Sequence, residues 1–97
     1  MNKVTFHEDA ESEMMEAAQY YEEKANGLGV SFLDTVEQAV DQVLENPLSC
    51  QLVGDRIRHK ILRRFPYSLL YMVEPDLIRI LAVAHHKRRP GYWRYRL

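Results

Sequence analysis

Two clusters of basic residues carry most of the chemistry that this sequence offers, and both lie in its second half. Alternating cations on one face of a strand make a stripe of positive potential that suits phosphates or a carboxylate-rich peptide. The alternative is an ordinary solvated strand face. Because five bases occur here without an interleaved acid, we favour a surface that binds an anionic partner. The first cluster consists of Arg56, Arg58, Lys60, Arg63 and Arg64.

The second cluster is the basic and aromatic C-terminal segment, residues 85–96. Arginine binds phosphate through paired hydrogen bonds, and tyrosine and tryptophan stack on bases. Alternatively, Tyr92 and Trp93 pack back on the sheet while the cations keep the tail solvated, and both readings can hold together. Across the second half of the chain we expect these residues to bind an anionic partner: Arg56, Arg58, Lys60, Arg63, Arg64, Arg79, Arg89, Trp93, Arg94 and Arg96.

The other reactive residue types do not form a recognisable site. His85 and His86 are adjacent, so on a strand they would point to opposite faces and would chelate a metal poorly. Ser68 lacks the flanking glycines of a nucleophile elbow. The single cysteine cannot form a disulfide within the chain. We therefore expect neither a metal nor a cofactor.

The charges are distributed unevenly along the chain, although its 97 residues carry a net charge of only −1. Residues 1–50 hold two lysines against eleven acids, whereas residues 51–97 hold eleven Lys and Arg against three acids. This asymmetry suggests an anionic partner for the basic half. The length predicts a single domain. No apolar run approaches the roughly 18 residues of a membrane helix, and no signal peptide is recognisable, so we expect a cytoplasmic protein without a membrane partner.

Two helices and four strands are needed to position the basic clusters. Residues 4–6 alternate as a strand, and apolar residues at helical spacing then predict one helix up to Asn26-Gly27 and a second from about Leu28 to Asn46-Pro47. The period then changes to two, which predicts strands at residues 56–61, 69–73 and 77–84. The last of these is apolar on both faces except at Arg79, which is typical of a central strand.

The order β-α-α-β-β-β predicts an α+β fold, with an antiparallel two-helix hairpin on one face of a mainly antiparallel sheet. Two helices cover only one face. We therefore expect the opposite face to be open and to carry Arg58 and Lys60, with Arg79 as a further candidate and the basic tail beside it.

Several strings within this pattern resemble the RelE/ParE toxin superfamily, and together they cover nearly the whole chain. The resemblance implies the fold described above and an antitoxin that wraps the toxin. The strings are the Glu-rich first helix ending in Tyr20-Tyr21, Gly27-Leu28-Gly29 with Phe32-Leu33, Asn46-Pro47, Arg64-Phe65-Pro66-Tyr67-Ser68-Leu69-Leu70-Tyr71, Ile80-Leu81-Ala82-Val83-Ala84-His85 and Arg89-Pro90-Gly91-Tyr92-Trp93.

The resemblance leaves the target open between two branches of the superfamily. RelE-like members cleave mRNA on the ribosome, and ParE-like members block DNA gyrase. RelE-like enzymes often carry an arginine just after the aromatic residue that opens the third strand, where this chain has Ser68 after Tyr67. This departure favours a gyrase-type or other non-nuclease toxin. A nuclease would use His85, His86, Arg88 and Tyr92, and a third alternative is a non-toxic relative that only binds its antitoxin.

Overall fold

The two helices form where the sequence predicts them in the computed structural model, which describes residues 3–97. Helix α1 spans Glu8–Lys24 and helix α2 spans Leu28–Glu45. His7 caps α1, because its Nδ1 accepts a hydrogen bond of 3.0 Å from the backbone N–H of Asp9. Helix α2 ends at Asn46, since the residue before a proline avoids the helical region. Neither helix has the length and apolar character that a membrane span requires.

A short glycine turn folds α1 and α2 into the predicted hairpin. Gly27 adopts a φ of 85°, a conformation that side-chain-bearing residues seldom adopt. Gly29 lies against α1 so closely that a Cβ atom there would be 2.4 Å from the carbonyl oxygen of Ala18. The Glu22 carboxylate accepts hydrogen bonds from the N–H groups of Gly27 and Gly29 at 2.8 and 2.9 Å, which ties the end of α1 to the start of α2.

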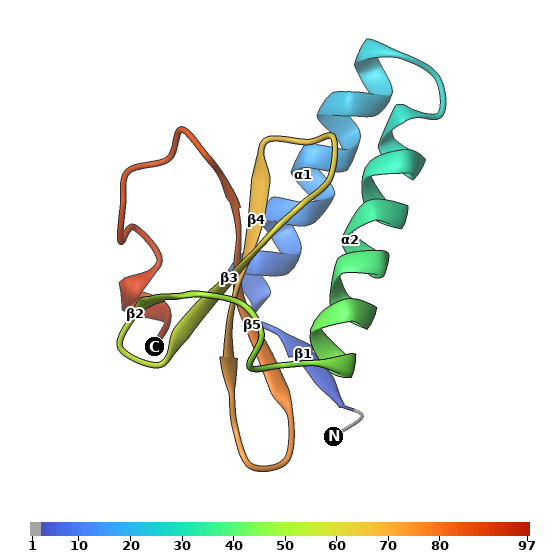
Figure 1. Ribbon diagram of the computed structural model, residues 1–97. Helices are drawn as coiled ribbons and strands as arrows, with labels where there is room; N and C mark the ends of the chain where they lie inside the picture. Colours follow the sequence, from blue (N-terminus) through green and yellow to red (C-terminus); the bar gives the residue numbers. More distant parts are fainter. Residues whose placement is uncertain (1–2) are drawn as a thin grey trace.

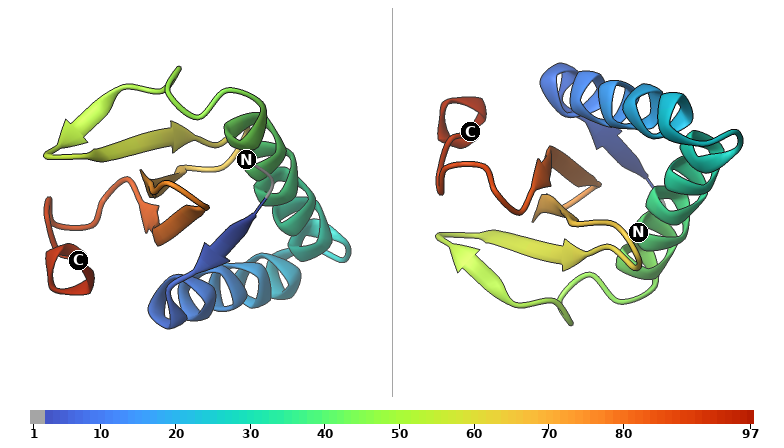
Figure 2. Two further views of the ribbon diagram at one scale, coloured as in Figure 1. Left: turned by 90° about the horizontal axis from the view of Figure 1, so that it is seen from below. Right: turned by 90° about the horizontal axis from the view of Figure 1, so that it is seen from above.

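Five strands form one mixed sheet, and both helices pack on the same face of it (Figure 1; Figure 2). The strands are β1 (Val4–Phe6), β2 (Leu52–Gly54), β3 (Ile57–Ile61), β4 (Tyr67–Val73) and β5 (Ile78–His85), in the order β1-β5-β4-β3-β2. Strand β1 pairs in parallel with β5, and the other pairs are antiparallel. The predicted fold class is confirmed, and the apolar strand β5 is an interior strand. Strand β2 was not predicted, because three residues with largely exposed side chains give no alternating pattern.

The face of the sheet opposite the helices is covered, so the prediction of an open face was wrong. Figure 2 shows the C-terminal segment crossing this face, with the helices on the far side of the sheet. Trp93 is only 6% exposed there and packs with Ile57, Leu70, Met72 and Leu81 in a second apolar cluster. A sheet whose interior strands are apolar on both faces needs a cover on each, and the tail provides the second one.

Strand β3 also faces the opposite way from the prediction. Residues directly across from each other in a sheet point to the same face, and Arg58 and Lys60 pair with Tyr71 and Leu69 of the helix-side core. The Arg58 guanidinium donates hydrogen bonds to the carbonyl oxygens of Leu48 and Cys50 at 3.2 and 2.7 Å, just beyond α2. The prediction assumed that Ile57 faces the helices, whereas Ile57 packs against Trp93.

Candidate functional site

A groove of about 300 Å³ lies between the tail-covered face of the sheet and the loop that leaves β5. No acidic residue is found among the described residues that line it, so its electrostatic character is cationic. Its polar lining comes from β3, β4, the end of β5 and the C-terminal segment: His59, Ser68, His85, His86, Arg88, Arg89 and Arg94. Its apolar lining is Val53, Leu70, Ala84, Pro90, Trp93 and the ring of Tyr92.

The floor of the groove holds a serine–histidine pair that the sequence analysis missed. Ser68 Oγ lies 3.0 Å from Nε2 of His86, and Ser68 itself is buried. Strand pairing sets this contact, because Ser68 lies opposite Ala84 and the backbone N–H of His86 donates to the carbonyl of Pro66 at 2.9 Å. Pairing residues 67–73 with residues 78–85 would have revealed it, since the hairpin register follows from the turn between them.

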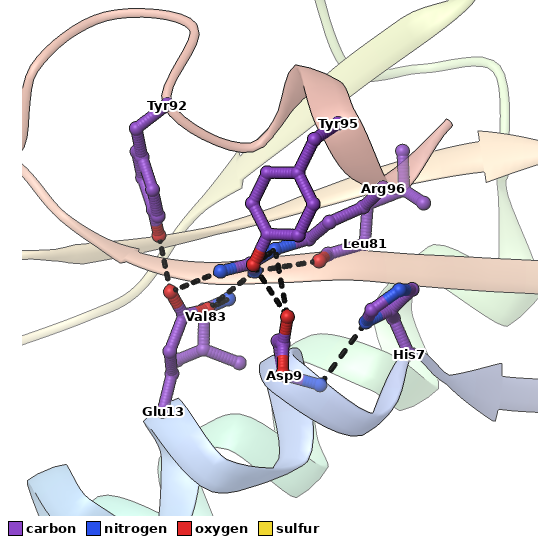
Figure 3. Close-up of polar contacts among 8 residues, drawn as sticks. All are labelled: His7, Asp9, Glu13, Leu81, Val83, Tyr92, Tyr95 and Arg96. Atoms are coloured by element: carbon purple, nitrogen blue, oxygen red, sulfur yellow. Dashed lines mark hydrogen bonds and ion pairs between the residues drawn. The ribbon is translucent and has the colours of Figure 1, made fainter.

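The wall of the groove is fixed by a hydrogen-bonded cluster between the tail and α1 (Figure 3). The Glu13 carboxylate accepts hydrogen bonds from Nη1 and Nη2 of Arg96, each at 2.9 Å. It also accepts hydrogen bonds from the Tyr92 hydroxyl at 2.7 Å and from the backbone N–H of Val83 at 3.0 Å. Arg96 also donates to the carbonyl of Leu81 at 2.9 Å. We call the cluster of Glu13, Tyr92 and Arg96 the tail anchor.

Asp9 strengthens this attachment one helical turn earlier on α1. Its carboxylate accepts a hydrogen bond from the Tyr95 hydroxyl and lies 3.9 Å from Nε of Arg96 (Figure 3). Hydrogen bonding to Glu13 raises the pKa of the Arg96 guanidinium further. Burial first, and then the bond to Glu13, raises the pKa of the Tyr92 hydroxyl.

Two residues predicted to bind a partner, Arg96 and Trp93, and one predicted to act in a nuclease, Tyr92, are therefore engaged in contacts within the chain. The Arg96 side chain is 4% exposed, and its anionic partner is Glu13. Trp93 belongs to the second apolar cluster. The Tyr92 hydroxyl donates a hydrogen bond to Glu13, which is not the arrangement of a proton donor that faces a substrate.

The remaining tail residues surround the groove in different ways. The Arg88 guanidinium stacks 3.9 Å from the centre of the Tyr92 ring. His85 meets the Tyr67 ring edge-on, with centroids 5.0 Å apart, and its Nδ1 accepts the Lys87 N–H at 3.0 Å. His85 and Arg88 also border a second hollow of about 250 Å³ beside Glu16 and Tyr20 of α1.

The structure does not bring the first basic cluster to the groove. Arg56 lies in the turn between β2 and β3 with a φ of 67°. Arg63 and Arg64 border a separate hollow beside α2. Arg79 lies on the tail-covered face but forms an ion pair with Glu74 at 3.7 Å. Within residues 3–97, no three His, Cys, Asp or Glu side chains are grouped closely enough to hold a metal ion.

Comparison with known proteins gives one family and one fold. The family model described as "ParE toxin of type II toxin-antitoxin system, parDE" matches residues 4–90. A solved structure titled "Chromosomal ParDE TA system from P. aeruginosa" is 19% identical and superposes with a TM-score of 0.62, covering 86% of this chain and 94% of that one. At this identity the structural match supports the fold alone. No curated protein sequence matches the chain.

Proposed function

The chain belongs to the ParE toxin family of type II toxin-antitoxin systems, and from this we propose that it stops growth by blocking DNA gyrase or a similar essential target. A cognate antitoxin neutralises it by binding the toxin directly. The proposed place of action is the cytoplasm, where such a target lies. The observation that carries the proposal is the family match, which spans residues 4–90 and so includes most of the cationic groove.

The groove is the proposed target-contact surface. Its exposed cations, Arg88, Arg89 and Arg94, lie in the C-terminal segment after β5, and Arg88 also borders α1. Clustered cations steer an anionic surface towards one face of a small protein. The first basic cluster lies elsewhere, so we assign it no part in contacting the target.

Two observations favour a blocking toxin over a nuclease. Ser68 occupies the position after Tyr67, where RelE-like enzymes often carry an arginine, and it is hydrogen-bonded to His86. The Tyr92 hydroxyl is bound to Glu13 and its pKa is raised, so it is poorly placed to donate a proton to a leaving group. Ribosome-dependent mRNA cleavage is the alternative that the experiment must separate.

Induced expression without a cognate antitoxin tests the proposal. We expect growth to stop within a few generations, plasmid DNA to lose its normal supercoiling, and co-expression of the cognate antitoxin to restore growth. An early stop codon in the same vector is the control. Normal growth at verified levels of folded protein would indicate a non-toxic, antitoxin-binding relative. Cuts within translated codons, mapped by primer extension, with normal supercoiling would indicate a nuclease instead.

A further inference from the structure

The groove has a chemical character that blocking a protein target does not require. Its cations and imidazoles surround a polar floor, while one wall is apolar. We propose that the groove binds the phosphoryl group of a nucleotide, with the sugar and base lying along the apolar wall. This goes beyond the proposed function, because a toxin that blocks a protein needs no nucleotide.

The arginines of the groove are held in place before a ligand arrives. Arg88 stacks on the Tyr92 ring, and the tail anchor fixes that ring from behind. The Arg94 side chain folds over Gly91, where an added Cβ atom would lie 3.0 Å from Nε of Arg94. Gly91 has a φ of 77°, so a glycine is favoured at this turn for its backbone as well as for space. Cations held in this way lose little side-chain entropy when an anion binds.

The floor adds further hydrogen-bonding groups to these charges. The Ser68 hydroxyl and the His86 imidazole share one hydrogen bond at 3.0 Å, and His59 of β3 lines the same groove. Phosphoryl oxygens accept hydrogen bonds from guanidinium, hydroxyl and imidazole groups together. A carboxylate has only two oxygens, so a phosphoryl group with three uses this set of donors more completely.

The size and the apolar wall indicate that the phosphoryl group is attached to a larger molecule. About 300 Å³ is at the lower end of volumes that hold a small organic ligand. Val53, Ala84 and Pro90 line the groove and are at least partly exposed; they offer nothing to a bare phosphate ion, but they suit the apolar faces of a sugar and a base. A free nucleotide and the end of a nucleic-acid strand present the same chemistry, and the experiment separates these sources.

The test is titration of the purified full-length protein with four probes. They are adenosine monophosphate, adenosine, inorganic phosphate and a 5′-phosphorylated single-stranded tetranucleotide. Trp93 is the only tryptophan and lines the groove, so its fluorescence reports binding, and amide NMR shifts locate it. We expect saturable binding of adenosine monophosphate at least about tenfold tighter than that of adenosine, consistent with the loss of charge-assisted hydrogen bonds. Comparable affinity for the tetranucleotide indicates a single-nucleotide site, and much tighter binding indicates a strand end. Either result supports the phosphoryl site.

Two matched double variants separate a site from general positive charge. Arg88→Gln/Arg89→Gln removes two exposed cations at the groove, and Arg63→Gln/Arg64→Gln removes two exposed cations beside α2. We expect the first to weaken nucleotide binding about tenfold or more and the second less than about twofold. Equal losses in both, or no saturable binding of any phosphorylated probe to the wild-type protein, would overturn the proposal. If the groove variant does not fold, the wild-type comparison of adenosine with its monophosphate decides. Neither measurement depends on toxicity, so the proposed function can fail while this site stands.

Discussion

The contacts of the tail anchor explain why Arg96, at the end of the cationic tail, has a structural role. Arg96 is the last charged residue of the chain, yet its side chain is nearly as buried as the core. A buried guanidinium is tolerable only when it is paired and its donors are satisfied, and Glu13, Leu81 and Tyr95 satisfy them. Composition marks Arg96 as one more surface cation, because nothing local in the sequence identifies Glu13 as its partner 83 residues away.

Replacing Arg96 should therefore cost far more stability than replacing a neighbouring arginine. In Arg96→Met we expect the free energy of unfolding to fall by about 3 kcal/mol, because breaking a buried ion pair leaves the Glu13 carboxylate without its cation. Arg94→Met, at an exposed position, should cost less than about 0.5 kcal/mol. Urea denaturation measures both. Equal costs in the two variants would mean that the tail anchor contributes little to stability.

Replacing Tyr92 with phenylalanine tests whether its hydroxyl has a structural or a catalytic role. Tyr92→Phe keeps the ring under Arg88 and removes the bond to Glu13, so we expect a loss of about 1 kcal/mol in unfolding free energy near neutral pH and no loss of toxicity. Folding raises the pKa of the Tyr92 hydroxyl above its ordinary value of 10. The stabilisation by this hydroxyl is therefore complete below pH 10 and declines as the pH rises further. The gap between wild type and variant should narrow above pH 10 in thermal denaturation. Toxicity that disappears in a stable Tyr92→Phe protein would instead assign the hydroxyl to the active chemistry.

Among the secondary-structure elements, the helices could be predicted from the sequence. Which face of β3 points towards the helices could not be predicted. The apolar stripes of α1 and α2 repeat over four or five turns, and Gly27 and Pro47 mark where the helices end. Strand β3 has five residues, and its alternation establishes two faces without assigning either to the helices. The assignment depends on Trp93, which lies 36 positions after Ile57 and covers it from the tail side. The contact between Ser68 and His86 was missed for a different reason, because it depends on the register between β4 and β5.

The geometry of the turn between α1 and α2 predicts different losses of stability when each of its two glycines is replaced. A methyl group at Gly29 would collide with the backbone of α1, which cannot shift without opening the hairpin, so Gly29→Ala should cost about 3 kcal/mol. Gly27→Ala meets no atom within 4 Å and strains only its left-handed backbone, so it should cost about 1 kcal/mol. Chemical denaturation of both variants, with Val30→Ala at an exposed position of α2 as the reference, measures the difference. The reverse order would show that backbone conformation, not close packing, governs this turn.

For the whole molecule, the two oppositely charged halves of the sequence become separate layers. The acidic half forms β1 and the two helices, and the basic half forms the rest of the sheet and the tail. The sequence predicted the α+β fold class, but from the charge asymmetry it predicted only an anionic partner for the basic half. The folded chain then divides the bases between the α2 side and the groove, with Arg96 drawn into the acidic layer. The groove combines cations with a polar floor and has no acidic residue among its described lining, whereas the hollow beside Arg63 and Arg64 also contains Asp34, so the groove carries the functional proposals.

The tail should be required for the stability of the whole domain, although the family match ends at residue 90. Removing residues 91–97 exposes Ile57, Leu70 and Leu81 and deprives Glu13 of Tyr92 and Arg96. Loss of a buried tryptophan alone costs about 3–5 kcal/mol, and loss of the ion pair adds about 3 kcal/mol. Together these approach the roughly 5–15 kcal/mol that stabilises an ordinary domain.

We therefore expect the protein shortened after residue 90 to lose its cooperative thermal transition and to bind a hydrophobic dye. Deletion of Leu97 alone, which is 62% exposed, should leave the melting temperature nearly unchanged and serves as the control. The melting temperature of Trp93→Ala should lie between those of the two shortened proteins, because this substitution removes the indole from the second apolar cluster but keeps the tail anchor. A cooperative transition near the wild-type temperature in the shortened protein would show that the sheet is stable with one face open. In that case the tail would serve only to build the groove.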